Sequence, residues 1–172
     1  MLLAEKKKAE NISEYIIYMY QTELLLRNFD LDIEKVKVHV IGNIPDEKVN
    51  KAELTAWYSE VIEAMKSEEL EKEGHLESVQ QKVNELSDLH LELLTSNSDY
   101  QQVFHAARPS IREGLQAAQG LISNPIQVCI NGVFGLLLAR MNGKEVEEGQ
   151  MGAIEHFGNV LSYLNYHYKQ SR

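Results

Sequence analysis

The chain has 172 residues, enough for one hydrophobic core and short for two, because domains commonly hold roughly 100 to 200 residues. An apolar content of 44% and a charged content of 25% exclude a disordered chain and predict one folded domain over residues 1–172. The formal net charge of -9, with the one basic run at residues 5–8, argues against nucleic-acid binding, which needs clustered Lys and Arg.

Apolar residues recur every three or four positions along nearly the whole chain, which predicts an all-α fold. We expect a single-domain antiparallel helical bundle of about six or seven helices. The first helix covers residues 4–28, and its middle, YIIYMY, is apolar or aromatic on every side, which is typical of a helix packed on more than one face. A short helix follows over residues 32–41, with its initial aspartate as N-cap. A third helix begins after Asp46 and ends or bends at Gly74.

The next region, residues 76–93, alternates apolar steps of three and four, the seam pattern of packed helices. His90 occupies one apolar position, where a neutral, hydrogen-bonded packing residue is favoured over a pH-sensitive contact. Ser98 and Gln101 form a capping box for another helix, which Pro109 should kink or end.

The segment from Asn124 to Gly143 has the clearest boundaries, with an N-cap and a proline at its start and a glycine at its end. Residues 126–141 are too few for a membrane span, which needs about 20 apolar residues. We expect a central core helix shielded from water. Gly132 and Gly135 each cost about 1 kcal/mol relative to alanine, so we expect a neighbouring helix backbone to approach closely there.

The last predicted helix covers residues 146–169. Beside its apolar stripe runs a second stripe of aromatic and polar residues, typical of a half-wet edge or of a protein interface. The members of this second stripe are His156, Asn159, Tyr163 and His167.

Both ends of the chain carry helix-packing patterns: AEKKKAENISEYIIYMYQTELLLR at the N-terminus, GVFGLLLARMNGKEV and AIEHFGNVLSYLNYHY near the C-terminus. Through these patterns the chain resembles, over essentially its whole length, a domain of unknown function found mainly in Bacteroides-type bacteria. The resemblance implies an intracellular helical protein and, since that family has no assigned activity, no catalytic residue. VEEGQ stands where a Ser or Thr cap is expected, so the start of the last helix is open.

The excess of acidic over basic residues lies in one region of the chain. Residues 46–99 hold 14 acidic and 5 basic residues, whereas the rest of the chain is balanced. Solvated helix faces explain this region, and a docking surface for a basic protein partner is the alternative. Cys129, the single cysteine, stands among apolar residues and predicts a small core residue, and the start of the chain lacks a secretory signal pattern, so we expect a cytoplasmic protein.

Arg140 ends the most apolar helix and needs a partner if it is buried, for which Glu14 or Glu23 is suited. We favour a structural ion pair, or a side chain that extends to water, and an anion-binding pocket is the alternative. The candidate ligand-binding residues, placed between the first helix and the last two, are Tyr15, Tyr18, Arg140, Tyr163 and His167.

Sequence motifs for metal binding and catalysis are missing from the chain. No histidine follows a glutamate by three positions, as di-iron bundles require, and the phosphate-binding loop, nucleophile elbow and HExxH patterns are absent. We therefore expect no metal, no cofactor and no membrane insertion. The sequence favours a non-catalytic interaction module that forms a homodimer, and a small-ligand-binding or enzymatic bundle is the alternative.

Overall fold

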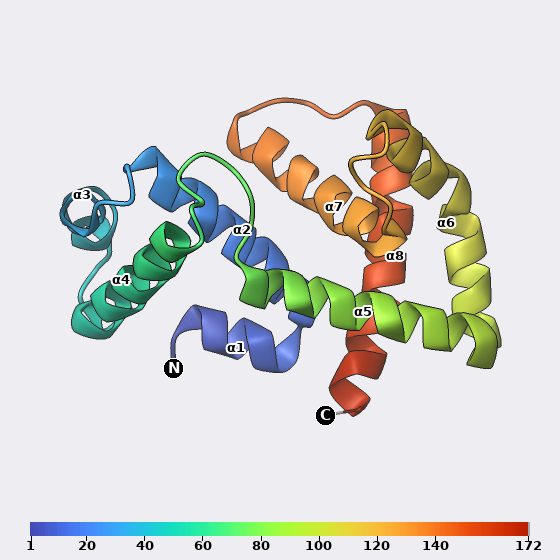
Figure 1. Ribbon diagram of the computed structural model, residues 1–172, viewed down its shortest axis with the longest axis horizontal. Helices are drawn as coiled ribbons and strands as arrows, with labels where there is room; N and C mark the ends of the chain where they lie inside the picture. The colour runs from blue at the N-terminus through green and yellow to red at the C-terminus, as the bar shows by residue number, and fades with distance from the viewer. Residues whose placement is uncertain (172) are drawn as a thin grey trace.

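The computed structural model describes residues 1–171 and is all-helical over that range, with no strand (Figure 1). It contains eight α-helices and one short 3-10 helix, Ile41–Asn43. The α-helices are α1 (Leu3–Glu10), α2 (Ile12–Asn28), α3 (Ile33–His39), α4 (Lys51–Ser67), α5 (Glu77–Ser96), α6 (Ser98–Ala117), α7 (Pro125–Met141) and α8 (Glu148–Gln170). The all-α prediction is confirmed, and the expected number of six or seven helices is too low.

The additional helix arises because the predicted first helix is broken at Asn11. This residue has an extended backbone, and its side-chain Oδ1 accepts a hydrogen bond from the Glu14 amide at 3.1 Å, so it caps α2. The break is held from the far end of the chain, since Asn165 of α8 accepts from the Ser13 amide at 3.0 Å and donates to its hydroxyl. An N-cap inside a helical pattern thus ends α1 and begins α2.

Pro109 neither ends nor restarts its helix, because α6 continues through it. The proline removes the hydrogen bond to the carbonyl of His105, and both residues lie on the exposed face, where water can solvate that carbonyl. The cap is also one residue earlier than expected: Asn97, rather than Ser98, accepts from the Tyr100 amide at 2.9 Å.

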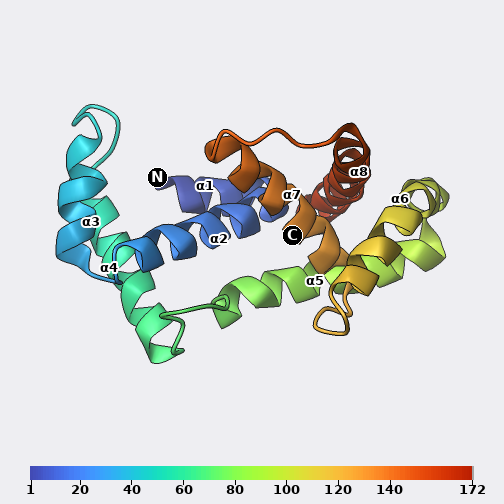
Figure 2. The same ribbon diagram turned by 90° about the horizontal axis from the view of Figure 1, so that it is seen from above.

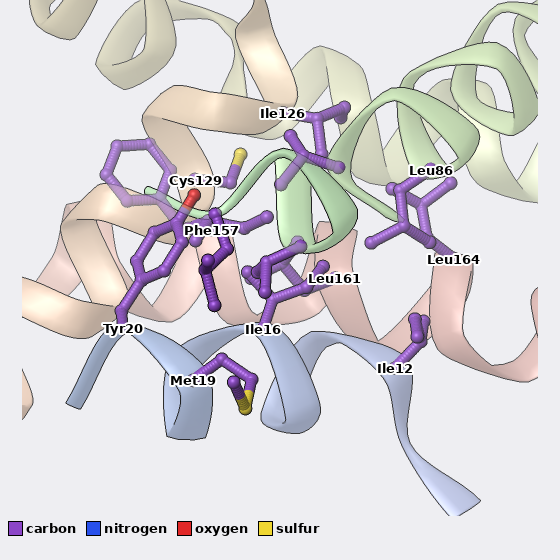
Figure 3. Packing of buried hydrophobic residues seen from close by; sticks show 14 of the residues in the cluster. Ile12, Ile16, Met19, Tyr20, Leu86, Ile126, Cys129, Phe157, Leu161 and Leu164 are labelled. Atoms are coloured by element: carbon purple, nitrogen blue, oxygen red, sulfur yellow. The ribbon is translucent and has the colours of Figure 1, made fainter. Parts of the chain in front are cut away.

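The core lies where α2, α5, α7 and α8 meet (Figure 3). Ile16, Leu86, Ile126 and Leu164, one from each of these helices, are fully buried. Helices α3 and α4 pack beyond the C-terminal part of α2, at the opposite end of the molecule from α6 and α8 (Figure 2). Helix α8 contacts α2, α5, α6 and α7 and so connects the second half of the fold to the first.

Helix α7 is buried only in its first half, so the expectation of a wholly shielded core helix is wrong. Ile126 and Val128 to Ile130 are buried, whereas no residue from Asn131 onward is fully buried, and Arg140 and Met141 are exposed. The physical reason is that α8 crosses α7 near its start and leaves the C-terminal half, where α2 alone stays alongside and reaches Met141 through Gln21 (Figure 1). None of the helices in residues 1–171 is long and apolar enough to cross a membrane.

The two glycines of α7 have different surroundings. A Cβ at Gly132 would lie 2.5 Å from the ring of Phe157. The close neighbour is therefore an aromatic side chain of α8, whereas a helix backbone was expected from the sequence. A Cβ at Gly135 would meet nothing within 4 Å. The cost of Gly135 in a helix, about 1 kcal/mol, is therefore not offset by packing within the subunit.

Candidate functional site

The second half of α7 lies over α2 with an open groove between the two helices. One hollow of the groove, of about 330 Å³, has an apolar wall formed by Ile17, Tyr18, Val133, Leu136 and Leu137. Because the hollow is open to solvent rather than enclosed, it suits a segment of another chain better than a small molecule, which a binding pocket normally encloses.

A second hollow of about 290 Å³ continues the groove toward the C-terminal end of α2, and the two share Tyr18 and Gln21. Leu138 and Met141 of α7 line it, and Gln21 Nε2 donates a weak hydrogen bond to Met141 Sδ at 3.4 Å. We call the surface formed by both hollows the α2–α7 face. Its lining residues are Lys7, Glu14, Ile17, Tyr18, Gln21, Thr22, Leu24, Leu25, Asn28, Tyr58, Val133, Leu136, Leu137, Leu138, Arg140 and Met141.

Charge at this face is concentrated at one edge. Lys7 forms an ion pair with Glu14 at 3.2 Å, and both line the first hollow beside Arg140. Arg140 is exposed, and no carboxylate of the described residues lies within 4 Å of it. The predicted ion pairs of Arg140 with Glu14 or Glu23 are therefore not formed within the subunit.

The five candidate ligand-binding residues do not share one pocket. Tyr18 and Arg140 line the same hollow, as the sequence predicted. Tyr15 lies under the Lys8 ammonium, 5.5 Å from its ring centroid, and lines neither hollow. Tyr163 and His167 stack on each other in α8, with ring centroids 5.5 Å apart.

The α8 pair belongs to a separate aromatic group. The Tyr163 ring also contacts Tyr100 of α6, at a centroid distance of 5.9 Å, and His167 contacts Tyr166, which is 63% exposed. This group has the half-wet character expected of the stripe on the last helix. It lies outside the α2–α7 face.

Glu23 has a role that sequence reasoning missed. Its side chain is fully buried, with Oε1 2.8 Å from His75 Nδ1 and Oε2 accepting from the Leu76 amide at 2.7 Å. One turn later, Arg27 Nε donates to the Leu70 carbonyl at 2.9 Å, and its Nη2 donates to the Gly74 carbonyl. Together the two α2 side chains fix the loop before α5.

A hydrogen-bonded ring of side chains joins α2, α5 and α7. The Tyr20 hydroxyl donates to Gln80, Gln80 donates to Gln127 at 3.0 Å, and Gln127 donates back to the Tyr20 oxygen at 3.1 Å. Gln127 also donates to Asn131 at 2.9 Å. Burial raises the pKa of Tyr20 to about 12, so it stays neutral and acts as a packing and hydrogen-bonding group.

The signal for this polar layer is visible in the sequence only in part. Glu23 stands in an apolar helix, which indicates a buried charge with a partner. The partner, His75, is 52 residues away and follows a loop, so no local pattern predicts the pairing.

Two further buried titratable groups of the core are neutral. His90 is 3% exposed, its Nδ1 lies 2.6 Å from the Tyr100 hydroxyl, and burial lowers its pKa to about 4. Cys129 is fully buried, and burial raises its pKa to about 12, which removes thiolate reactivity. Both residues are packing residues, as the sequence predicted.

No group of three or more His, Cys, Asp or Glu side chains within residues 1–171 is placed to hold a metal ion. The Glu23–His75 pair has the form of a carboxylate–imidazole dyad, but a nucleophile needs to lie within hydrogen-bond reach of the base. The Tyr20 ring stacks on His75 instead, with centroids 3.6 Å apart. The arrangement is consequently suited to holding helices together.

Comparison with known proteins gives a family and no activity. A family model described as a domain of unknown function, DUF4924, matches residues 1–172. The chain belongs to the DUF4924 family. No curated protein matches the chain, and no solved structure matches it.

The acidic region of the DUF4924 chain uses part of its charge locally. Asp46 pairs with Lys51 at 2.8 Å, and its hydrogen bond with that ammonium lowers its pKa. Glu68 accepts from the Glu77 amide at 2.8 Å, at the start of α5. These bonds account for some of the carboxylates, and a basic partner for the others stays a prediction.

Proposed function

We propose that this protein is a non-catalytic helical interaction module, located in the cytoplasm, that forms a homodimer through the α2–α7 face. The observation that carries the proposal is the exposure of large apolar side chains on one continuous surface. Met141 is 64% exposed and Leu24 is 37% exposed, on either side of a groove with apolar walls. Contiguous exposed apolar patches are typical of interaction sites.

The surface area of the chain supports a protein-sized occupant. A compact monomer of 19.7 kDa has about 8,600 Å² of accessible surface, whereas this chain has 10325 Å². The excess, about 1,700 Å², exceeds the roughly 800 Å² that each partner buries in a standard interface. A second copy seated on the α2–α7 face would cover part of this excess.

Charge supports a second copy at this face in preference to other surfaces. With a net charge of -9, two copies repel each other when their acidic regions, residues 46–99, approach. Among the described residues, the charged side chains at the α2–α7 face are instead those of Lys7, Glu14 and Arg140 alone. Like faces can therefore approach without a large electrostatic penalty.

The test is the mass in solution of wild type and of paired variants, by light scattering after size-exclusion chromatography at tens of micromolar. Leu24→Glu/Met141→Glu puts charge on the face at two exposed positions, so the fold should persist and the dimer should dissociate. The matched control, Leu91→Glu/Leu121→Glu, changes leucines that are 60% and 92% exposed elsewhere. A monomeric wild type, or a face variant that stays dimeric, would contradict the proposal.

A second candidate function, a small-ligand-binding bundle, is favoured by one observation: Tyr18 and Arg140 line the same hollow. An anionic molecule with an apolar body would suit this lining. Native mass spectrometry of freshly purified wild type and of Arg140→Ala tests it. A small molecule retained by wild type and lost in the variant would support this function, and wild type without a retained molecule would end it.

A further inference from the structure

We infer that, in the dimer, Arg140 of each subunit pairs with Glu14 of the partner subunit, so that each groove is completed by the second copy. The inference rests on the proposed dimer and specifies the contact that orients it. It follows from the charged groups at the α2–α7 face and from the symmetry of a contact between identical surfaces.

Arg140 forms no ion pair with the described residues of its own subunit. It lines the first hollow next to Ile17, Val133 and Leu137, yet no described carboxylate lies within 4 Å of its guanidinium. In the isolated subunit the exposed guanidinium is hydrated. Covering the face removes that water, and an unpaired guanidinium would then oppose association strongly.

Glu14 is the carboxylate available at this surface. It is the one acidic residue lining either hollow of the groove among the described residues, and its side chain is 58% exposed. Its oxygen Oε2 already accepts from Lys7 at 3.2 Å, so its other oxygen is open to a second donor. A carboxylate can accept from two cations at once.

Symmetry makes the pairing reciprocal. In a two-fold contact the same patch is used by both subunits, so when Arg140 meets Glu14 of the partner subunit, Glu14 meets the partner's Arg140. Each dimer then contains two equivalent ion pairs on either side of the axis. Apolar side chains between them, including Leu137 and Met141, fill the grooves.

The test uses two charge reversals that are each unfavourable alone and complementary when mixed. In an Arg140→Glu homodimer, the introduced carboxylate would face Glu14 of the partner subunit, and in a Glu14→Arg homodimer, the introduced guanidinium would face the partner's Arg140. We expect each variant alone to dimerise at least about tenfold more weakly than wild type, since close interfacial charge pairs contribute strongly to affinity. If these residues do not meet across the interface, the two variants mixed one to one should associate no more tightly than either variant alone.

 The inferred contact gives the opposite result, because each glutamate of one variant then meets an arginine of the other, and the mixture should regain an affinity within about threefold of wild type.

Mixing also separates pairing from folding, because a misfolded variant would not be rescued by another. The control is a mixture of Lys144→Glu with Glu92→Arg, which makes the same change of net charge at exposed positions outside both hollows. We expect each control variant alone to dimerise like wild type. Sedimentation equilibrium of all samples gives the dissociation constants.

The possible outcomes test the pairing of Arg140 with Glu14 separately from the dimer itself. A tighter heterodimer in the Arg140→Glu and Glu14→Arg mixture, with no such gain in the control mixture, supports the pairing. A dimeric wild type whose reversed variants are not rescued by mixing would overturn the pairing and leave the dimer. A monomeric wild type would overturn the proposed function itself.

Discussion

The two halves of α7 have similar apolar sequences and opposite environments. From Ile126 to Ile130 the helix is enclosed by α2, α5, α6 and α8. From Val133 to Met141 it borders the α2–α7 face on one side and, on the other, a hollow of about 470 Å³ that Gly135 lines together with residues of α6 and α8. Hydrophobicity alone therefore does not reveal which half holds the subunit together. The first half stabilises the fold, and we assign the second half to association.

The largest expected effect is on the free energy of unfolding. It is measured by replacing one apolar residue in each half of α7. Ile130→Ala removes a fully buried side chain and should lower the free energy of unfolding by about 3 kcal/mol. Leu137→Ala, at a half-exposed position, should cost under about 1 kcal/mol in the monomer and weaken the dimer instead. Urea denaturation at submicromolar and at tens of micromolar protein separates the two effects. Equal losses of unfolding free energy in the two variants at submicromolar protein would contradict the distinction between the halves.

A second prediction concerns pH and the buried surroundings of the first half. Burial lowers the pKa of His90 to about 4 from an ordinary value of 6.5, so the folded state binds this proton less readily than the unfolded state. The contribution of His90 is complete above pH 6.5 and is lost as pH falls toward 4. We expect wild type to lose roughly 2 kcal/mol of stability between pH 7 and pH 5 from this group.

The matched variant for this prediction is His90→Gln, which has no titrating group and keeps a hydrogen-bonding partner for Tyr100. Its stability should depend less on pH over the same interval than that of wild type. Unfolding in urea at several pH values gives both curves. Parallel curves would show that His90 does not contribute.

The smallest expected effect is that of Gly135→Ala, and Gly132→Ala is its contrast on the same helix. Gly132→Ala brings a methyl group against the Phe157 ring and should cost about 1 to 3 kcal/mol, because the ring must move. Gly135→Ala meets no atom within 4 Å and should stabilise the monomer by up to about 1 kcal/mol. Thermal unfolding of both variants checks the signs. Destabilisation by Gly135→Ala would mean that the hollow beside it is filled in the folded subunit.

Local sequence signals predicted both ends of α7. Features that depend on contacts between residues far apart in the chain were not predicted. Asn124 caps the helix by accepting from the Ile126 amide at 2.9 Å, with Pro125 as its first residue, as expected. The interruption at Asn11 was missed because it depends on a contact with α8 as well as on the cap itself.

The candidate site was predictable to a similar degree. Of the five candidate ligand-binding residues, Tyr18 and Arg140 line one hollow because α2 and α7 pack side by side, and their binding of a ligand stays a prediction. Tyr163 contacts Tyr100 of α6 instead, His167 stacks on Tyr163, and Glu23 takes His75 as its partner, and these contacts depend on how the helices cross. Periodicity gives the apolar face of a helix but not which part of it is covered.

The central claim is that the second half of α7 is covered by a second copy of the chain, and the rate of thiol labelling at residue 141 tests it directly. Native Cys129 is buried and unreactive, so Met141→Cys provides a single reactive thiol, and Leu91→Cys is a control of similar exposure, 60% against 64%. The account predicts that labelling by a maleimide slows at position 141 as protein concentration rises through the dimerisation range, while labelling at position 91 does not. A rate at position 141 that is independent of concentration would contradict it.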